Sequence, residues 1–125
     1  MSPSNSEVFC VDCPGRKIMA RLLSKWSGLV VRCLDFRTMR YSELRRSIGG
    51  ISQKMLTQTL RELEADGLVE RTVYPIVPPK VEYALTGLGH SLVGPLTELG
   101  NWVESHAGEI EAANLRYADG AKKSA

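Results

Sequence analysis

No stretch of this chain approaches the roughly 20 apolar residues that a membrane-spanning helix needs. The longest apolar runs are as short as "GLVV", and the N-terminal "MSPSNSEVF" lacks the basic and apolar regions of a secretory signal. Only three cysteines occur in 125 residues, which is too few for a disulfide framework. We therefore expect a cytoplasmic protein that has no membrane partner and keeps its cysteines as thiols.

The sequence also lacks the motifs of common enzyme classes. It contains no glycine-rich phosphate-binding loop and no Ser/His/Asp set. A C-x-x-C pair is present at Cys10 and Cys13, but no strand precedes it, as a thioredoxin-like oxidoreductase would require. We therefore expect no catalytic residues and no cofactor, and we predict that the protein is not an enzyme.

What the chain does contain is an uneven distribution of charge. Hydrophobic residues make up 43% and charged residues 24%, as in an ordinary globular domain. Between Pro14 and Arg46 there are nine Lys/Arg residues and two acids, whereas after Thr86 there are three basic and five acidic residues. A basic half is typical of a surface that meets an anionic polymer, although a plain solvated face has the same composition.

Two N-terminal segments, residues 14–24 and 25–36, show helical periodicity. In the second segment, Trp26, Val30 and Cys33 are spaced as one apolar stripe. The following "RTMRY" is typical of a short strand. These patterns predict two helices and a strand before the middle of the chain.

The next segment has a helix-turn-helix pattern. Ser42 is expected to cap a short helix, "ELRRSI", which "GG" ends. Ser52 is expected to cap a longer helix that runs to about Asp66 and stops at Gly67. Two helices joined by a short glycine-containing turn are typical of this motif.

The remainder of the chain predicts a hairpin and a long helix. Residues on both sides of "PIVPPK" alternate as in two strands with a proline-stiffened tip. After Gly87, apolar residues recur at helical spacing, namely Leu88, Leu92, Leu96, Leu99, Trp102 and Val103. The order of elements predicts an α+β fold that is mainly α, a winged helix-turn-helix with additional helices at both ends.

The helix expected over residues 52–66 has leucines on one side and polar residues opposite. The polar residues at i, i+3, i+4 and i+7 are Lys54, Thr57, Gln58 and Arg61. Gln pairs with adenine, Arg with guanine, and Thr with either a base edge or the thymine methyl. The acids come late, so the N-terminal half, which is the positive end of the helix dipole, is free to enter a groove.

Other basic residues suit phosphate contacts, which position a protein on DNA without reading its sequence. They are Arg45 and Arg46 on the preceding helix and Lys80 at the hairpin tip. A winged helix that binds only another protein is the alternative. The charges on the 52–66 helix favour DNA, because the centre of a protein interface tends to be depleted of charge.

At these residues the sequence resembles the HxlR family of winged-helix transcriptional regulators. The resemblance spans roughly Cys13 to Val103 and is carried by "CPGRK", "KWSGLVV" and "RYSELRRSIGGISQKMLTQTLRELEADGLVERTVYPIVPPKVEYALTGLG". It implies a homodimer that binds double-stranded operator DNA, often next to its own gene, with dimerisation helices at both ends, and we expect such a regulator to act as a repressor. It further implies that the recognition helix, including Ser52 and Gln53, extends to Arg61 and that residues 71–85 form the wing.

The apolar surface of the last helix supports dimerisation independently. It covers more of the helix than one intramolecular contact needs, and a two-fold dimer would bury it. We therefore divide the chain into an N-terminal extension (residues 1–12), a DNA-binding domain (13–86), a C-terminal dimerisation helix (87–118) and a flexible tail (119–125).

The two N-terminal cysteines leave several interpretations open. Cys13 precedes Pro14 at an expected helix start, where the helix dipole and nearby basic residues favour a thiolate. In the family that this sequence resembles, the cysteine that matches Cys13 senses oxidants or electrophiles in several members. Cys10 lies outside the usual family pattern and is a second candidate redox residue, and Cys33 could form a disulfide with Cys13 of either subunit. An inert thiol, a zinc site shared across a dimer, and regulation by a bound small ligand are the alternatives.

Overall fold

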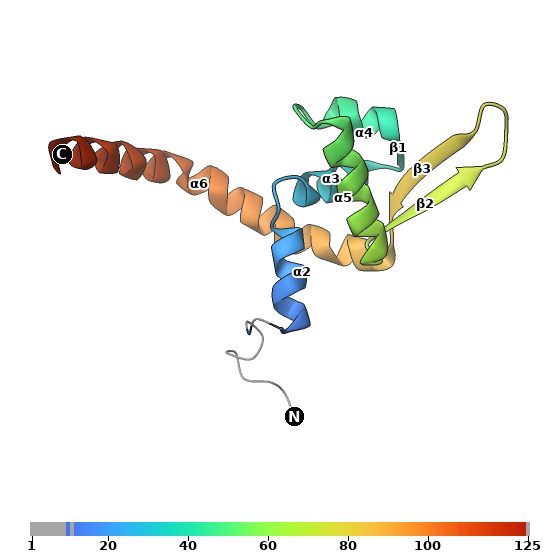
Figure 1. The fold of residues 1–125 in the computed structure, drawn as a ribbon, viewed down its shortest axis with the longest axis horizontal. Coiled ribbons are helices and arrows are strands. Elements are labelled where there is room, and N and C mark those ends of the chain that lie inside the picture. The colour runs from blue at the N-terminus through green and yellow to red at the C-terminus, as the bar shows by residue number, and fades with distance from the viewer. Residues whose placement is uncertain (1–9, 11, 125) are drawn as a thin grey trace. The chain divides into compact units, whose positions relative to one another are not determined.

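The structure is a computed structural model that describes Cys10 and residues 12–124, with side chains to residue 121. The chain divides into two compact units, Met1–Val93 and Gly94–Ala125. The first unit contains helices and a three-stranded antiparallel sheet in the order β1-β3-β2. The predicted winged helix-turn-helix is confirmed (Figure 1). Within the described residues, no helix is both long and apolar enough to cross a membrane.

The first two helices are α2 (Pro14–Leu22) and α3 (Ser27–Phe36). Cys13 is the N-cap of α2 and Pro14 its first residue, as predicted. None of the nine residues of α2 is buried. Helix α3 carries the core contacts, but the expected stripe is only partly correct. Val30 is buried, whereas Trp26 and Cys33 are half-buried, and the other apolar core positions are Val31 and Leu34.

Strand β1 (Met39–Arg40) leads into α4 (Tyr41–Ser47), which starts earlier than predicted. Ser42 is not its cap, because the helix already begins at Tyr41. The Arg40 backbone N–H instead donates to Glu43 Oε1 at 3.1 Å, so a glutamate in the first turn satisfies a free N–H group at the helix start.

Helix α5 (Gln53–Ala65) begins and ends as predicted. The Ser52 hydroxyl accepts a hydrogen bond from the Met55 N–H at 3.1 Å, which is the expected N-cap. After the helix, Gly67 has φ +76°, a left-handed conformation that favours glycine. The inward face of α5 is buried at Leu56, Thr59, Leu60 and Leu63.

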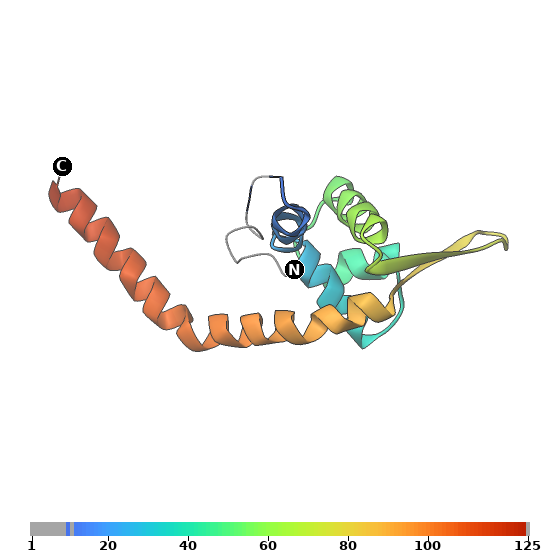
Figure 2. The same ribbon diagram turned by 90° about the horizontal axis from the view of Figure 1, so that it is seen from below.

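The hairpin consists of β2 (Val69–Tyr74) and β3 (Lys80–Leu85), with a register from the Val69–Leu85 pair to the Tyr74–Lys80 pair. Strand β1 pairs with the other edge of β3. In both views the hairpin projects away from helices α3, α4 and α5 (Figure 1 and Figure 2). Residues 75–79 at its tip are exposed.

The core of the first unit lies among α3, α4, α5 and the base of the sheet. Its buried apolar side chains are Val30, Val31, Leu34, Met39, Leu44, Ile48, Ile51, Leu56, Leu60, Leu63, Leu68, Val69 and Leu85. The start of the last helix is tied to this core, because the Thr86 hydroxyl donates to the Gly67 carbonyl at 2.6 Å and accepts from the Gly89 N–H at 3.1 Å. A Cβ at Gly89 would overlap the Leu68 carbonyl, so this close approach needs glycine.

Helix α6 spans Gly87–Ser124 and continues through Pro95. It therefore extends beyond the boundary expected at residue 118, and residues 119–124 are helical. Alanine and lysine follow Gly120 in this segment, and both favour a helix. The division into compact units also falls inside α6, after Val93, rather than at its start.

Candidate nucleic-acid interface

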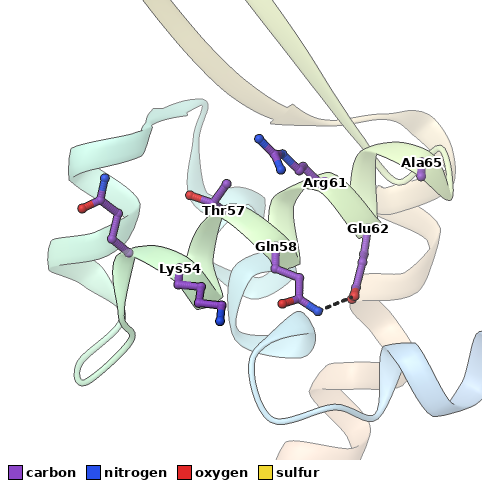
Figure 3. A pocket seen from close by; sticks show the side chains of 7 residues that line it. Lys54, Thr57, Gln58, Arg61, Glu62 and Ala65 are labelled. Atoms are coloured by element: carbon purple, nitrogen blue, oxygen red, sulfur yellow. Dashed lines mark hydrogen bonds between the residues drawn. The ribbon is translucent and has the colours of Figure 1, made fainter.

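The four polar residues predicted to share one face of α5 are brought together by the structure. Lys54, Gln58 and Arg61 are exposed and Thr57 is half-buried. They line one open hollow along the helix, whose complete lining is Gln53, Lys54, Thr57, Gln58, Arg61, Glu62 and Ala65 (Figure 3). Ser52 is not among the residues that line the hollow, and its hydroxyl caps the helix.

The start of this face is held by a tyrosine that the sequence analysis missed. The Tyr41 hydroxyl on α4 donates to the Gln53 carbonyl at 2.8 Å and lies 3.1 Å from Thr57 Oγ1. Because a phenol has one proton, Thr57 must donate in the second contact when Tyr41 donates in the first. The Thr57 hydroxyl is therefore already oriented by its own protein.

One acid of the C-terminal half of α5 also lines this hollow, although the N-terminal half carries no acid, as expected. The Gln58 amide Nε2 donates to Glu62 Oε1 at 3.2 Å, and Glu62 lines the same hollow (Figure 3). The four-residue spacing was the available signal, because side chains at i and i+4 are neighbours on a helix.

The residues expected to contact phosphate differ in whether neighbouring groups compensate their positive charges. Arg45 and Arg46 are exposed in the last turn of α4. Lys80 is not at the hairpin tip but begins β3, with its ammonium 3.0 Å from Glu82 Oε1 and 5.1 Å from the centre of the Tyr74 ring. Its charge is partly compensated by these neighbours, so it is a weaker candidate than the two arginines.

A second, smaller hollow of about 230 Å³ lies between α5 and the hairpin. Arg61 borders both hollows, and Arg71 on β2 approaches Glu64 on α5 at 3.4 Å. Tyr83 also lines the smaller hollow, and burial raises the pKa of its phenol. The base of the hairpin is thus connected to the candidate DNA-binding helix α5 by polar side chains.

A bidentate ion pair connects the C-terminal end of α5 to α2. Arg21 Nε and Nη2 donate to the two carboxylate oxygens of Asp66 at 2.9 and 2.8 Å. Asp66 is the C-cap residue of α5 and Arg21 lies in the last turn of α2. This pairing connects the helix that follows the cysteines to the end of the candidate DNA-binding helix.

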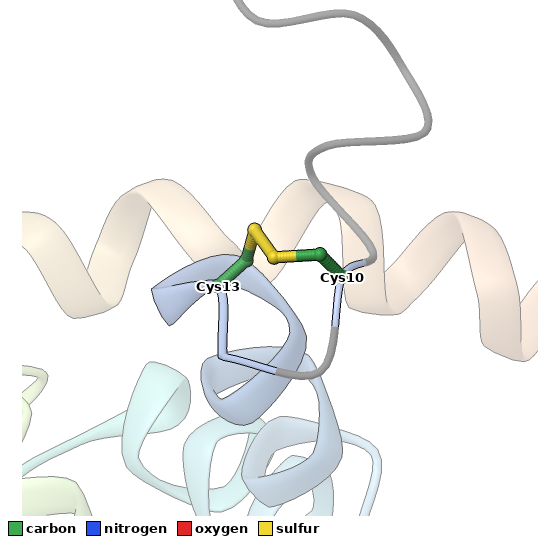
Figure 4. Close-up of a disulfide and its surroundings, with 2 residues drawn as sticks. All are labelled: Cys10 and Cys13. Carbon is green, nitrogen blue, oxygen red and sulfur yellow. A yellow bond between two sulfur atoms is a disulfide. The ribbon is translucent and has the colours of Figure 1, made fainter.

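The N-terminal cysteines differ from their expected thiol state, because Cys10 and Cys13 form a disulfide (Figure 4). Their three-residue separation places both sulfurs at the start of α2. Cys33 is free and half-buried, and burial raises the pKa of its thiol. Within Cys10 and residues 12–124, no three His, Cys, Asp or Glu side chains form a group that could hold a metal ion.

The residues proposed for dimerisation keep much apolar surface uncovered. Leu88, Leu99, Trp102 and Val103 are about half exposed, and Leu92 and Leu96 are half-buried.

Both histidines were expected at the surface. His90 is exposed, 3.8 Å from Asp35, whereas His106 is half-buried and stacks on Trp102 at 4.4 Å between ring centres.

Comparisons with known proteins agree with this geometry. The HxlR-like helix-turn-helix family matches residues 21–111. The uncharacterized HTH-type transcriptional regulator YtfH of Escherichia coli (strain K12) is 43% identical over 105 residues, which are 84% of this chain and 83% of the relative.

Solved structures give the same result. The structure of ytfH from Salmonella typhimurium superposes with a TM-score of 0.79 at 40% identity, covering 86% of this chain and 96% of that protein. The redox regulator HypR in its reduced form superposes with a TM-score of 0.73 at 40% identity, covering 79% and 98%. The chain therefore belongs to the HxlR-like helix-turn-helix family and is a transcriptional regulator of the helix-turn-helix type.

Proposed function

We propose that this regulator is a homodimer that represses transcription by binding double-stranded operator DNA with helix α5 in the major groove. The observation that carries the proposal is the polar face of α5. Lys54, Gln58 and Arg61 are exposed there on one side of a capped helix, while the leucines opposite are buried. An exposed helix with this chemistry fits the width of the major groove.

The side chains divide into base readers and phosphate contacts. Gln58 suits adenine and Arg61 suits guanine, each through two hydrogen bonds, and Thr57 offers a methyl group to thymine. Ser52 and Gln53 lie at the N-terminal end of α5, where backbone N–H groups and the helix dipole favour phosphate. Arg45, Arg46 and Lys80 would contact the flanking backbone.

Dimerisation is supported by the uncovered apolar side chains of α6. Trp102 is 53% exposed and Leu99 is 48% exposed. A two-fold dimer would cover such residues and place two copies of α5 about 34 Å apart, which is one turn of DNA.

Selection of binding sites from a random duplex library tests the DNA-binding proposal directly. We expect enrichment of an inverted repeat whose half-sites are centred one helical turn apart. Transcription in vitro from a promoter that carries the selected site should fall on addition of the protein. A library that shows no enrichment after repeated rounds would contradict operator binding.

A second proposal concerns the Cys10–Cys13 pair. We infer that the pair senses two-electron oxidants, since both thiols lie at the start of α2 and can give up two protons and two electrons to form the disulfide. The solved relative HypR is named a redox regulator. A response to a bound ligand instead of thiol chemistry is the alternative, as is a purely structural pair.

We expect the Cys13→Ser variant to bind operator DNA as the reduced parent does and to lose any response to oxidant. Serine keeps the size of the side chain but cannot form the disulfide with Cys10. The measurement is DNA affinity before and after treatment with a mild thiol oxidant.

Cys33→Ser is the matched control, because Cys33 is the remaining cysteine and forms no disulfide in this structure. It should respond to oxidant as the parent does. A Cys13→Ser protein that still responds would show that sensing does not use this pair.

A further inference from the structure

Glu62 differs from the two other acids near the end of α5. Glu64 and Asp66 form ion pairs with arginines of other elements. The Glu62 side chain instead accepts a hydrogen bond from Gln58 Nε2 at 3.2 Å. Within the described residues, this is the one hydrogen bond of the Glu62 side chain, and its charge, after that of Asp66, also contributes to raising the pKa of the Arg21 guanidinium on α2.

The pair lies where DNA is proposed to bind. Gln58 is exposed, Glu62 is half-buried, and both line the open hollow along α5 (Figure 3). The hydrogen bond between them lies at the exposed surface of the helix, where the two side chains are neighbours one turn apart. The Glu62 carboxylate therefore holds the Gln58 amide from the side, within the same surface.

The chemistry of an amide explains what this support would do. A glutamine amide has two N–H donors and one carbonyl acceptor, and its two ends exchange when it rotates by 180°. Recognition of adenine needs one N–H for N7 and the carbonyl for N6. A hydrogen bond from the other N–H to a carboxylate leaves this donor and acceptor pair available and disfavours the rotated amide.

The carboxylate has a second effect through its charge. It accepts hydrogen bonds but donates none, so it repels the acceptor-rich major-groove edge of guanine and the phosphates of any DNA. At the correct sequence the carboxylate also supports the contact between Gln58 and adenine, which offsets the repulsion. At an incorrect sequence the repulsion acts alone, so binding there is weakened more.

We propose that Glu62 is a positioning residue for DNA sequence specificity, which holds the Gln58 amide in the orientation that reads adenine. The inference rests on the proposed binding of α5 in the major groove. Glu62 need not touch a base, because it acts through Gln58 and through its charge.

The test uses the full-length protein, the duplex selected from the random library and duplexes with single base changes. Glu62→Ala should bind unrelated DNA more tightly, since one negative charge is lost. It should also discriminate at least about fivefold less at the base pair read by Gln58, because alanine offers no acceptor to the Gln58 amide and a bidentate base contact contributes about 1–3 kcal/mol.

Glu62→Asp separates geometry from charge, because the shorter side chain keeps the charge but does not reach Gln58. It should lose the same discrimination without any gain in affinity for unrelated DNA. Glu70→Ala is the matched control for charge removal, because Glu70 is exposed on β2 and does not line the hollow. It should discriminate as the parent does.

A double-mutant cycle with Gln58→Ala decides between support and direct reading. If Glu62 acts through Gln58, adding Glu62→Ala to Gln58→Ala causes no further loss of discrimination. A further loss equal to that in the parent would overturn the inference, as would parental discrimination in Glu62→Asp. A parent protein that shows no sequence preference would instead contradict the proposed function itself.

Discussion

Replacing Arg61 by alanine is expected to weaken binding to the selected operator by about 1–3 kcal/mol, which is roughly 5- to 150-fold. Arg61 is exposed in the middle of the polar face of α5, and its planar guanidinium can donate two hydrogen bonds to one guanine. The loss should be concentrated at one base pair, where the variant tolerates substitutions that the parent rejects. Fluorescence anisotropy on the operator and on singly substituted duplexes measures both effects, and Gln58→Ala should behave similarly at a neighbouring pair.

Arg116→Ala is the control for this prediction. It removes the same charge from an exposed position on α6 that does not line the hollow on α5. It should leave the sequence preference unchanged. If Arg61→Ala weakened binding equally on all duplexes, Arg61 would be a phosphate contact, and its proposed role as a base reader would be wrong.

Replacing Leu56 by alanine is expected to lower the free energy of unfolding by about 2–5 kcal/mol. Leu56 is fully buried on the inner face of α5, where the structure cannot close around the missing methyl groups without moving the helix. A loss of this size is a large fraction of the stability of a small domain. Urea unfolding followed by circular dichroism measures it.

Val77→Ala provides the comparison for Leu56→Ala. Val77 is 99% exposed at the hairpin tip, so its truncation should change stability by less than about 0.5 kcal/mol. A loss below about 1 kcal/mol for Leu56→Ala would contradict the assignment of this face of α5 to the core.

The parts of the fold set by local chemistry were predictable from the sequence. Ser52 and Gly67 could be assigned to the two ends of α5 without knowing the fold. A serine hydroxyl accepts a backbone N–H at the start of a helix, and glycine tolerates the positive φ that often follows its end. The leucine stripe of α5 was likewise readable from its spacing. Together these fixed the position and the exposed face of the candidate recognition helix.

The sequence-based predictions were wrong or incomplete where tertiary packing decides which side chains are buried or in contact. Val31 and Leu34 occupy the core instead of Trp26 and Cys33, because the buried side of α3 depends on how it packs against α5 and β3. The contact of Tyr41 with Thr57 joins residues 16 positions apart, which no helical spacing reveals. The Gln58–Glu62 hydrogen bond, by contrast, follows from the i, i+4 rule and could have been predicted.

The most direct test of the proposed function is the affinity of the reduced protein for its selected operator and for a scrambled duplex, measured by fluorescence anisotropy at about 50 and about 200 mM salt. We predict tighter binding to the operator and a steep loss with salt on both duplexes, since six to ten phosphate contacts would lower affinity by about 10³–10⁵ over this range. Equal affinity for both duplexes, or affinity that salt leaves unchanged, would contradict sequence-specific DNA binding through α5 and would favour a protein-interaction module.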